Sequence, residues 1–207
     1  DNPPTNLELS VFADSCMTEL VEGVLLVRLK SNARKINKMN EYGYTQQAAV
    51  IQNEQDQENK DIISAFYDHY TFSKVYFFYS EYSNNVRAKD FSEPFFLDEN
   101  LQVDTSIVLP TSKFLTAEFG NVQRNESAYD DFYISNAEKK SERTPSYWAG
   151  PDLHFGALRM MTSQFHQLRR PFPRYVRTFD SISLFKRSTP KTVIKLNEKL
   201  NAYFTKY

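Results

Sequence analysis

The chain has 207 residues, of which 41% are hydrophobic and 25% charged, and its formal net charge is −1. This size and composition predict one compact domain and exclude a disulfide-dependent miniprotein, because a chain of this length buries roughly 70% of its unfolded surface. Cys16 is the only cysteine, which excludes an intrachain disulfide, a Cys-x-x-Cys redox pair and a cysteine-built zinc site. No apolar run approaches the roughly 20 residues that cross a bilayer, so we expect no transmembrane segment.

Charge is divided unevenly along the chain. Residues 1–154 carry 14 basic and 24 acidic side chains, whereas residues 155–207 carry 11 basic and 2 acidic ones. The basic segment either folds against acidic elements of the same domain or converges on an anion. The near-zero total favours the first interpretation, because it gives no long-range attraction for a polyanion. The acidic balance of the first 154 residues also argues against nucleic acid as a partner.

The N-terminal segment is polar and is expected to form a tail over about residues 1–18. It begins at Asp1, without an initiator methionine. This start fits a mature protein whose leader has been removed, so the segment itself suggests export.

The next part of the chain predicts a βαβ unit. A continuous apolar run over 20–30 predicts a central strand, and a short helix is expected over 33–43. An apolar stripe over 45–70 predicts a long amphipathic helix, on which the polar cluster at 52–59 is expected to face solvent. Residues 74–79 predict a second buried strand, parallel to the first across a right-handed crossover.

A β-rich stretch follows this unit. Short strands separated by turn residues are expected over 95–97, 107–109 and 114–119. Alternation in the third strand places Glu118 on the side opposite Leu115, where we expect it to face solvent.

The remainder predicts a long loop, antiparallel strands and a closing helix. Residues 120–153 are polar and are expected to form a long loop. A strand over 155–161 and a return over 165–168 follow, and the prolines in 171–178 predict an edge strand. From Ser188 onward the sequence predicts a C-terminal amphipathic helix. The fold class is therefore α/β: a single domain with a mixed sheet, an N-terminal βαβ unit, later antiparallel strands and a C-terminal helix.

Motifs for cofactor binding and catalysis are missing. The chain contains no Gly-x-Gly-x-x-Gly, Walker-type, Gly-x-Ser-x-Gly or His-Glu-x-x-His motif, so no cofactor is expected. His154 and His166 would face each other across a hairpin near Arg169 and Arg170, as an acid/base pair beside an anion clamp. Because we identify no third catalytic group, a histidine-dependent hydrolase is the least favoured function.

Three groups of residues are candidates for ligand binding. Ser80 and Ser83 follow the second strand, where parallel sheets collect ligands, although capping of a short helix explains them better. Tyr147 and Trp148 are expected in a rigid turn, where they would either stack on a ligand or pin the long loop to the body. The third group consists of four arginines: Arg169, Arg170, Arg174 and Arg177. Regular alternation would place Arg174 apart from Arg177, which weakens this cluster.

Three segments carry a family resemblance: Glu54–Asn59 in the long helix, Val75–Ser80 in the second strand, and Pro171–Thr178. Together they resemble an uncharacterised family of exported proteins from anaerobic bacteria. The resemblance implies export and a single α/β domain. It implies no activity, cofactor or catalytic residue.

These observations lead to two expectations for function. The first is a non-catalytic domain, secreted, periplasmic or at the cell surface, that binds a protein or surface component. The alternative is a binder of a small anionic ligand, which would use the arginines together with the loop after Tyr79 or with Trp148.

Overall fold

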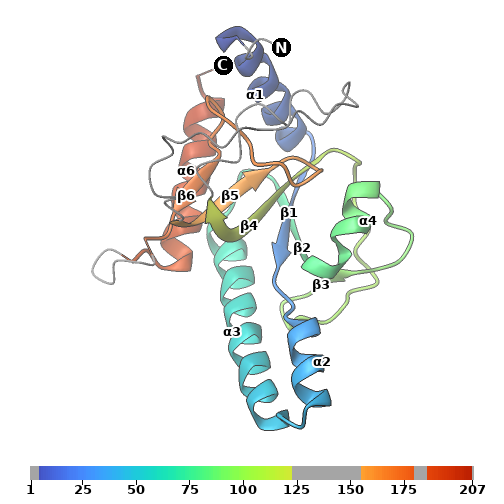
Figure 1. The fold of residues 1–207 in the computed structure, drawn as a ribbon. Helices are drawn as coiled ribbons and strands as arrows, with labels where there is room; N and C mark the ends of the chain where they lie inside the picture. The colour runs from blue at the N-terminus through green and yellow to red at the C-terminus, as the bar shows by residue number, and fades with distance from the viewer. Residues whose placement is uncertain (1–4, 123–154, 180–185, 207) are drawn as a thin grey trace, which may run out of the picture.

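A mixed six-stranded sheet forms the centre of the computed structural model, which describes residues 5–122, 155–179 and 186–206 (Figure 1). The strands are β1 (Val24–Leu29), β2 (Lys74–Tyr79), β3 (Phe96–Leu97), β4 (Phe114–Val122), β5 (Phe155–Met161) and β6 (Tyr175–Arg177). The helices are α1 (Asn6–Val21), α2 (Ala33–Glu41), α3 (Thr45–His69), the 3-10 turn η1 (Ser80–Tyr82), α4 (Ser83–Ala88) and α6 (Thr189–Phe204).

The sheet topology confirms the predicted α/β class. The strand order is β3-β2-β1-β4-β5-β6, with β2, β1 and β4 parallel and the other neighbours antiparallel. β1 and β2 pair directly, from Val24 opposite Lys74 to Leu29 opposite Tyr79, and α2 and α3 connect them. This is the predicted βαβ unit, and α6 is the predicted C-terminal helix.

Alternating side chains give the sheet two different faces. One face packs against α1, α3 and α6 around residues such as Leu25, Val27 and Leu158. The other face packs a smaller aromatic cluster, including Phe78 and Phe95, against α4 and the chain after it. Each such fully buried side chain contributes about 1.5–3 kcal/mol to stability. In Figure 1 these helices lie on opposite sides of the sheet.

The expectation of a polar tail over residues 1–18 is wrong, because α1 occupies most of it. The helix starts with a capping box, in which Thr5 Oγ1 accepts from the backbone N–H of Glu8 and the Glu8 carboxylate accepts from the Thr5 N–H. Its buried positions, at helical spacing, are Ala13, Cys16, Met17 and Leu20. Exposed apolar residues on the other side of the helix, including Leu7 and Val11, obscure this period in the sequence.

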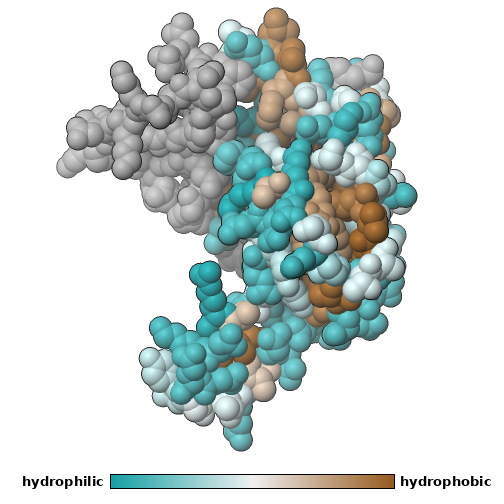
Figure 2. Space-filling model, turned by 90° about the vertical axis from the view of Figure 1, so that its right-hand side faces the viewer, coloured by the Kyte–Doolittle hydropathy of each residue, from teal (hydrophilic) through white to brown (hydrophobic). Residues whose placement is uncertain are grey.

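Buried amide side chains fix the start of a helical arm. α2 and the first half of α3 form this arm, which extends beyond the sheet (Figures 1 and 2). Asn59 is 1% exposed, and its side-chain amide donates to the Lys30 carbonyl at 2.8 Å. Gln55, also buried, accepts a 2.8 Å hydrogen bond from the Asn32 amide. The polar cluster at 52–59 is therefore not a fully solvated face, because these two side chains hold the connection from β1 to α2.

Two other expected strands differ from the structure. Residues 107–109 form no strand; instead Ile107 and Leu109 pack against the second apolar cluster. Residues 165–168 make one isolated bridge, between Met161 and Gln167. β4 runs on to Val122, so the expected loop over 120–153 begins inside a strand, and its residues from 123 lie outside the described part. Among the described helices, none is long and apolar enough to cross a membrane.

Candidate anion-binding site

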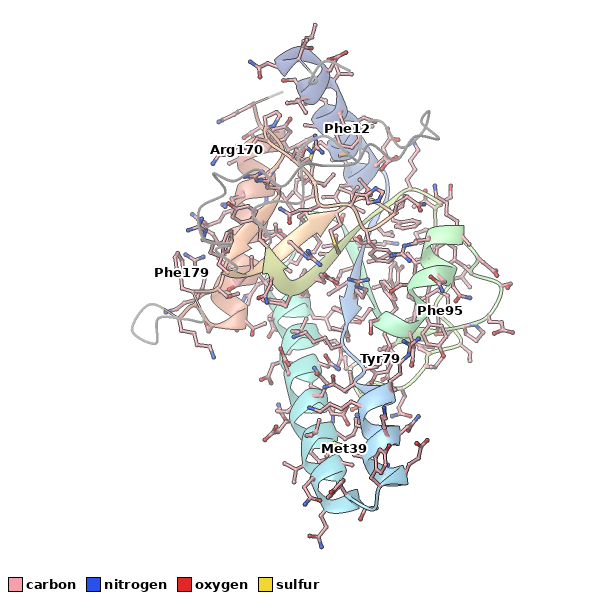
Figure 3. All side chains as sticks on the ribbon, in the orientation of Figure 1. Phe12, Met39, Tyr79, Phe95, Arg170 and Phe179 are labelled. Atoms are coloured by element: carbon pink, nitrogen blue, oxygen red, sulfur yellow. The ribbon has the colours of Figure 1, made fainter. Side chains whose placement is uncertain are left out.

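A surface pocket of about 370 Å³ lies between the segment before β6 and the C-terminal half of α6. We call it the basic pocket. Its charged lining residues are Arg170, Arg174, Lys199 and Lys206, and none of the described residues that line it is acidic. Figure 3 shows Arg170 beside α6, on the opposite side of the molecule from Phe95. The structure therefore brings two of the four predicted arginines together with two lysines that the prediction does not include.

An aromatic contact holds the two walls of the basic pocket together. Phe172 is 2% exposed and Tyr203 is 8% exposed, and their ring centroids lie 5.9 Å apart. The Tyr203 hydroxyl donates to Asp14 on α1 at 2.9 Å, which ties the pocket to a third element. Because Phe172 is fixed in this way, Arg170 and Arg174 are held on either side of it at the pocket.

The electrostatic environment of the basic pocket is positive. Lys199 donates from Nζ to the Tyr175 carbonyl at 3.0 Å. Burial lowers the pKa of Lys199, and the nearby cations Lys195, Arg187 and Arg170 lower it further, against an opposing effect of Tyr175. Burial raises the pKa of Tyr175, but Arg174 and Arg177 outweigh it and the net shift is downward. A bound anion would relieve this repulsion among cations.

The other two predicted arginines do not line the pocket. Arg177 lies beyond Tyr175 on β6, with its guanidinium carbon 4.1 Å from the centroid of the Phe155 ring. Arg169 is half-buried and is not part of the pocket wall. Arg174 and Arg177 both interact with the Tyr175 side chain, so they are closer than regular alternation predicts, but only Arg174 lines the pocket.

Ser80 and Ser83 lie far along the sheet from the basic pocket. Ser80 starts η1 after β2, and three strands separate β2 from β6. The Ser83 hydroxyl donates to the Ser80 carbonyl and receives a 3.3 Å hydrogen bond from Arg28 Nη1. The structure thus assigns Ser83 to the turn that begins α4, and it does not join this loop to the arginines in one site.

Three predicted site residues, Tyr147, Trp148 and His154, lie outside the described residues. His166 lies in the turn after β5, where its backbone N–H donates to Thr162 Oγ1 at 3.3 Å. The hairpin pairing of His154 with His166 stays a prediction.

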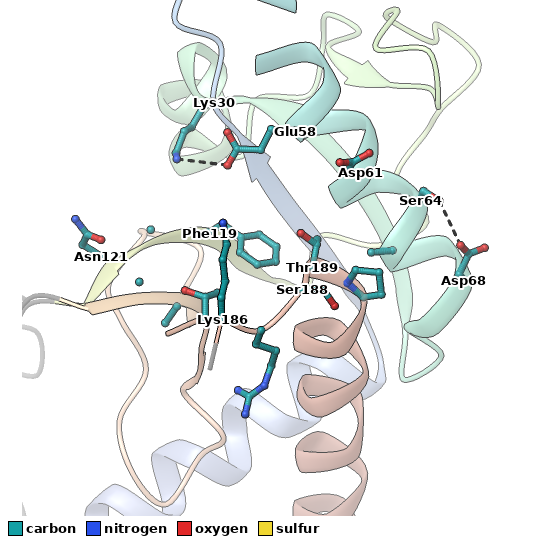
Figure 4. A pocket seen from close by; sticks show the side chains of 17 residues that line it. Lys30, Glu58, Asp61, Ser64, Asp68, Phe119, Asn121, Lys186, Ser188 and Thr189 are labelled. Atoms are coloured by element: carbon teal, nitrogen blue, oxygen red, sulfur yellow. Dashed lines mark hydrogen bonds and ion pairs between the residues drawn. The ribbon is translucent and has the colours of Figure 1, made fainter. Parts of the chain in front are cut away.

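A larger pocket of about 670 Å³ lies at the carboxyl ends of β1 and β4 (Figure 4). This is the topological switch point, because the chain leaves β1 toward β2 on one side while β4 lies on the other. The lining of this switch-point pocket is mixed in charge: Glu58, Asp61 and Asp68 come from α3, and Lys186 and Arg187 precede α6. Lys30 already pairs with Glu58 at 3.8 Å. The carboxylates on one wall of the switch-point pocket would repel an anion, so the smaller basic pocket is the better anion site.

The structure also reveals an ionic cluster that the sequence reasoning misses. Glu118 is 8% exposed, so the expectation that it faces solvent is wrong. Its Oε1 accepts from Arg159 Nε at 2.8 Å and from Arg159 Nη2, and its Oε2 accepts from Arg28 Nε and Nη2. Both arginines therefore bind the carboxylate through two nitrogens. Finding this cluster requires the order β1-β4-β5, which places the three residues side by side.

The described residues contain no cluster of three or more His, Cys, Asp or Glu side chains placed to hold a metal ion. Burial and the nearby Glu19 raise the pKa of the Cys16 thiol to about 12, so this cysteine is a poor nucleophile. Comparisons of the chain with protein-family models, with curated proteins and with solved structures find no match.

Proposed function

We propose that this domain binds an anionic ligand in the basic pocket. The observation that supports the proposal is the convergence of Arg170, Arg174, Lys199 and Lys206 on one pocket whose described lining has no carboxylate. The pocket volume, about 370 Å³, lies within the range of about 300–1,000 Å³ typical of small-ligand sites. An exported location, which the family resemblance implies, is part of the same proposal, and cell fractionation tests it.

The arginines and the lysines of the pocket would bind an anion in different ways. Each guanidinium offers a planar fork that can donate two parallel hydrogen bonds to a carboxylate or phosphate. Pro171 and Pro173 restrict the backbone between Arg170 and Arg174, so little backbone conformational entropy is lost when the two side chains bind a ligand. Lys199 supplies a point charge whose position is fixed by the Tyr175 carbonyl.

Calorimetric titration with citrate and inorganic phosphate at low salt tests the proposal. Arg174→Ala and Lys199→Ala should each weaken binding by about tenfold or more, since a hydrogen bond to a charged group contributes about 1.5–3 kcal/mol. Lys38→Ala on α2 is the matched control, because it removes one exposed cation far from the pocket. Equal affinities of the wild type, the two pocket variants and the control would contradict the proposal.

A further inference from the structure

A row of lysines runs along one flank of α6. Three lysines of α6 fall within an arc of about 80° around the helix axis, at 100° per residue, on the flank next to the buried stripe: Lys191, Lys195 and Lys199. The row spans about 12 Å along the axis, in two steps of about 6 Å. It extends beyond the basic pocket, which it enters at Lys199, and Lys206 follows in the turn after the helix.

The lysine row and the basic pocket form one continuous surface. Lys199 belongs to both, because it lies one helical turn after Lys195 on α6 and lines the pocket together with Arg170. Glu198 is an acidic residue on the same flank of α6, and its carboxylate pairs with the Lys195 ammonium at 2.8 Å. Both side chains are more than half exposed, so this ion pair is weak and a ligand can displace it.

The neighbouring edge of the sheet limits how a partner can bind. The Tyr175 carbonyl of β6 accepts from Lys199, and the Arg177 carbonyl accepts from Arg187. These two acceptors are occupied, so an incoming chain is not expected to pair with β6 as an added strand. Contact must instead be made through the cationic side chains.

We propose that the partner is an extended acidic segment of another protein, which lies along the lysine row and places one carboxylate in the basic pocket. This inference rests on the proposed function and names its ligand. In an extended chain every second side chain points to the same side, at intervals of about 6.6–6.8 Å. That repeat closely matches the spacing of about 6 Å between Lys191, Lys195 and Lys199. A segment with an acid at every second position thus meets successive lysines.

Calorimetry with three synthetic peptides, each acetylated and amidated at its ends, tests the assignment. The first alternates serine and glutamate over five repeats, the second has the same composition but gathers its glutamates into one block, and the third is the tripeptide Ser-Glu-Ser. At low salt the alternating peptide should bind at least tenfold more tightly than the tripeptide and several-fold more tightly than the block peptide.

Substitutions in the lysine row distinguish the row from the pocket. Lys191→Ala and Lys195→Ala should each weaken binding of the alternating peptide by about threefold or more, yet change citrate affinity less than twofold. Glu198→Gln should strengthen binding of the alternating peptide, because Lys195 is released from its ion pair.

The outcomes separate this inference from the proposed function. If citrate binds and depends on Arg174, but the alternating peptide binds no better than the tripeptide, the acidic segment is refuted and the anion pocket stands. Binding of polygalacturonate with the same lysine dependence, without binding of the peptide, would replace the protein partner by an acidic polysaccharide. If none of the probes binds, both proposals fall. The substituted residues are all at the surface or half-buried, and thermal unfolding checks that each variant is folded.

Discussion

Replacing Glu118 by Gln tests the ionic cluster between β1, β4 and β5. The substitution keeps the shape of the side chain but removes the charge that both Arg28 and Arg159 contact. Two guanidinium groups would then lie next to each other, with an amide between them that can accept at one atom only. The variant should therefore have a lower free energy of unfolding than the wild type. The size of the loss depends on how deeply the cluster is buried.

The expected loss is about 2–4 kcal/mol. Breaking a fully buried ion pair by removing one partner costs about 3–5 kcal/mol. In this cluster the side chains of Glu118, Arg28 and Arg159 are 10%, 20% and 17% exposed, so water relieves part of the penalty. A domain of this kind is stable by only about 5–15 kcal/mol, so the loss is a large fraction of the total.

Urea unfolding followed by circular dichroism measures the loss as a shift of the midpoint at unchanged slope. Glu198→Gln is the matched control, because it breaks an exposed pair on α6 and should cost less than about 0.5 kcal/mol. The triple variant Arg28→Met, Glu118→Leu, Arg159→Met, in which no charge is left unpaired, should be more stable than Glu118→Gln. If Glu118→Gln costs no more than Glu198→Gln, the cluster does not stabilise the fold and the reasoning is refuted.

Three further substitutions have defined expectations. The Cβ of Gly23→Ala would lie 2.2 Å from the Lys113 carbonyl oxygen, so this variant should lose about 3 kcal/mol of stability, the upper end of the range typical of overpacking. Equal urea midpoints for the variant and the wild type would contradict this expectation. Asn59→Ala should cost about 1–3 kcal/mol in the same assay, since it removes the part-buried hydrogen bond of the Asn59 amide to the Lys30 carbonyl. A loss as small as that of exposed Gln57→Ala would contradict this expectation. Cys16 has a thiol pKa raised from 9.0 to about 12, so the folded state disfavours the thiolate. Its contribution to stability should be constant below about pH 9 and fall between about pH 9 and 12, and Cys16→Val should remove that part of the decline.

The elements that the sequence predicts best are those with a long regular pattern. β1 and β2 each carry an apolar run and α6 an apolar stripe, and the stripe of α3 is long enough to be recognised although Gln55 and Asn59 interrupt it. The same reasoning misses α1, because exposed apolar residues such as Leu7 and Val11 blur its buried stripe and its polar first residues look like a tail. Its buried side chains pack on β1 and β4, and β4 lies far from α1 in the sequence.

The candidate site is predictable only in part, for a related reason. Arg170 and Arg174 lie close together in the sequence, so their contribution to a basic site is expected. Lys199 and Lys206 join them because α6 packs beside the segment before β6, a contact that no local pattern contains. The burial of Glu118 is unpredictable in the same sense, since it follows from strand order rather than from the alternation within β4.

The helical arm has a consequence for how the molecule opens. α2 buries none of its residues, and Ala48 is the buried residue in the facing first turns of α3. Apolar burial there is too small to make the arm part of the global cooperative unit, so its amide hydrogens should exchange through local opening. Because β1 and β2 pair with each other directly, the arm can unfold and refold while the sheet that it connects stays intact. Native-state hydrogen exchange should therefore find two levels of protection within the single crossover from β1 to β2.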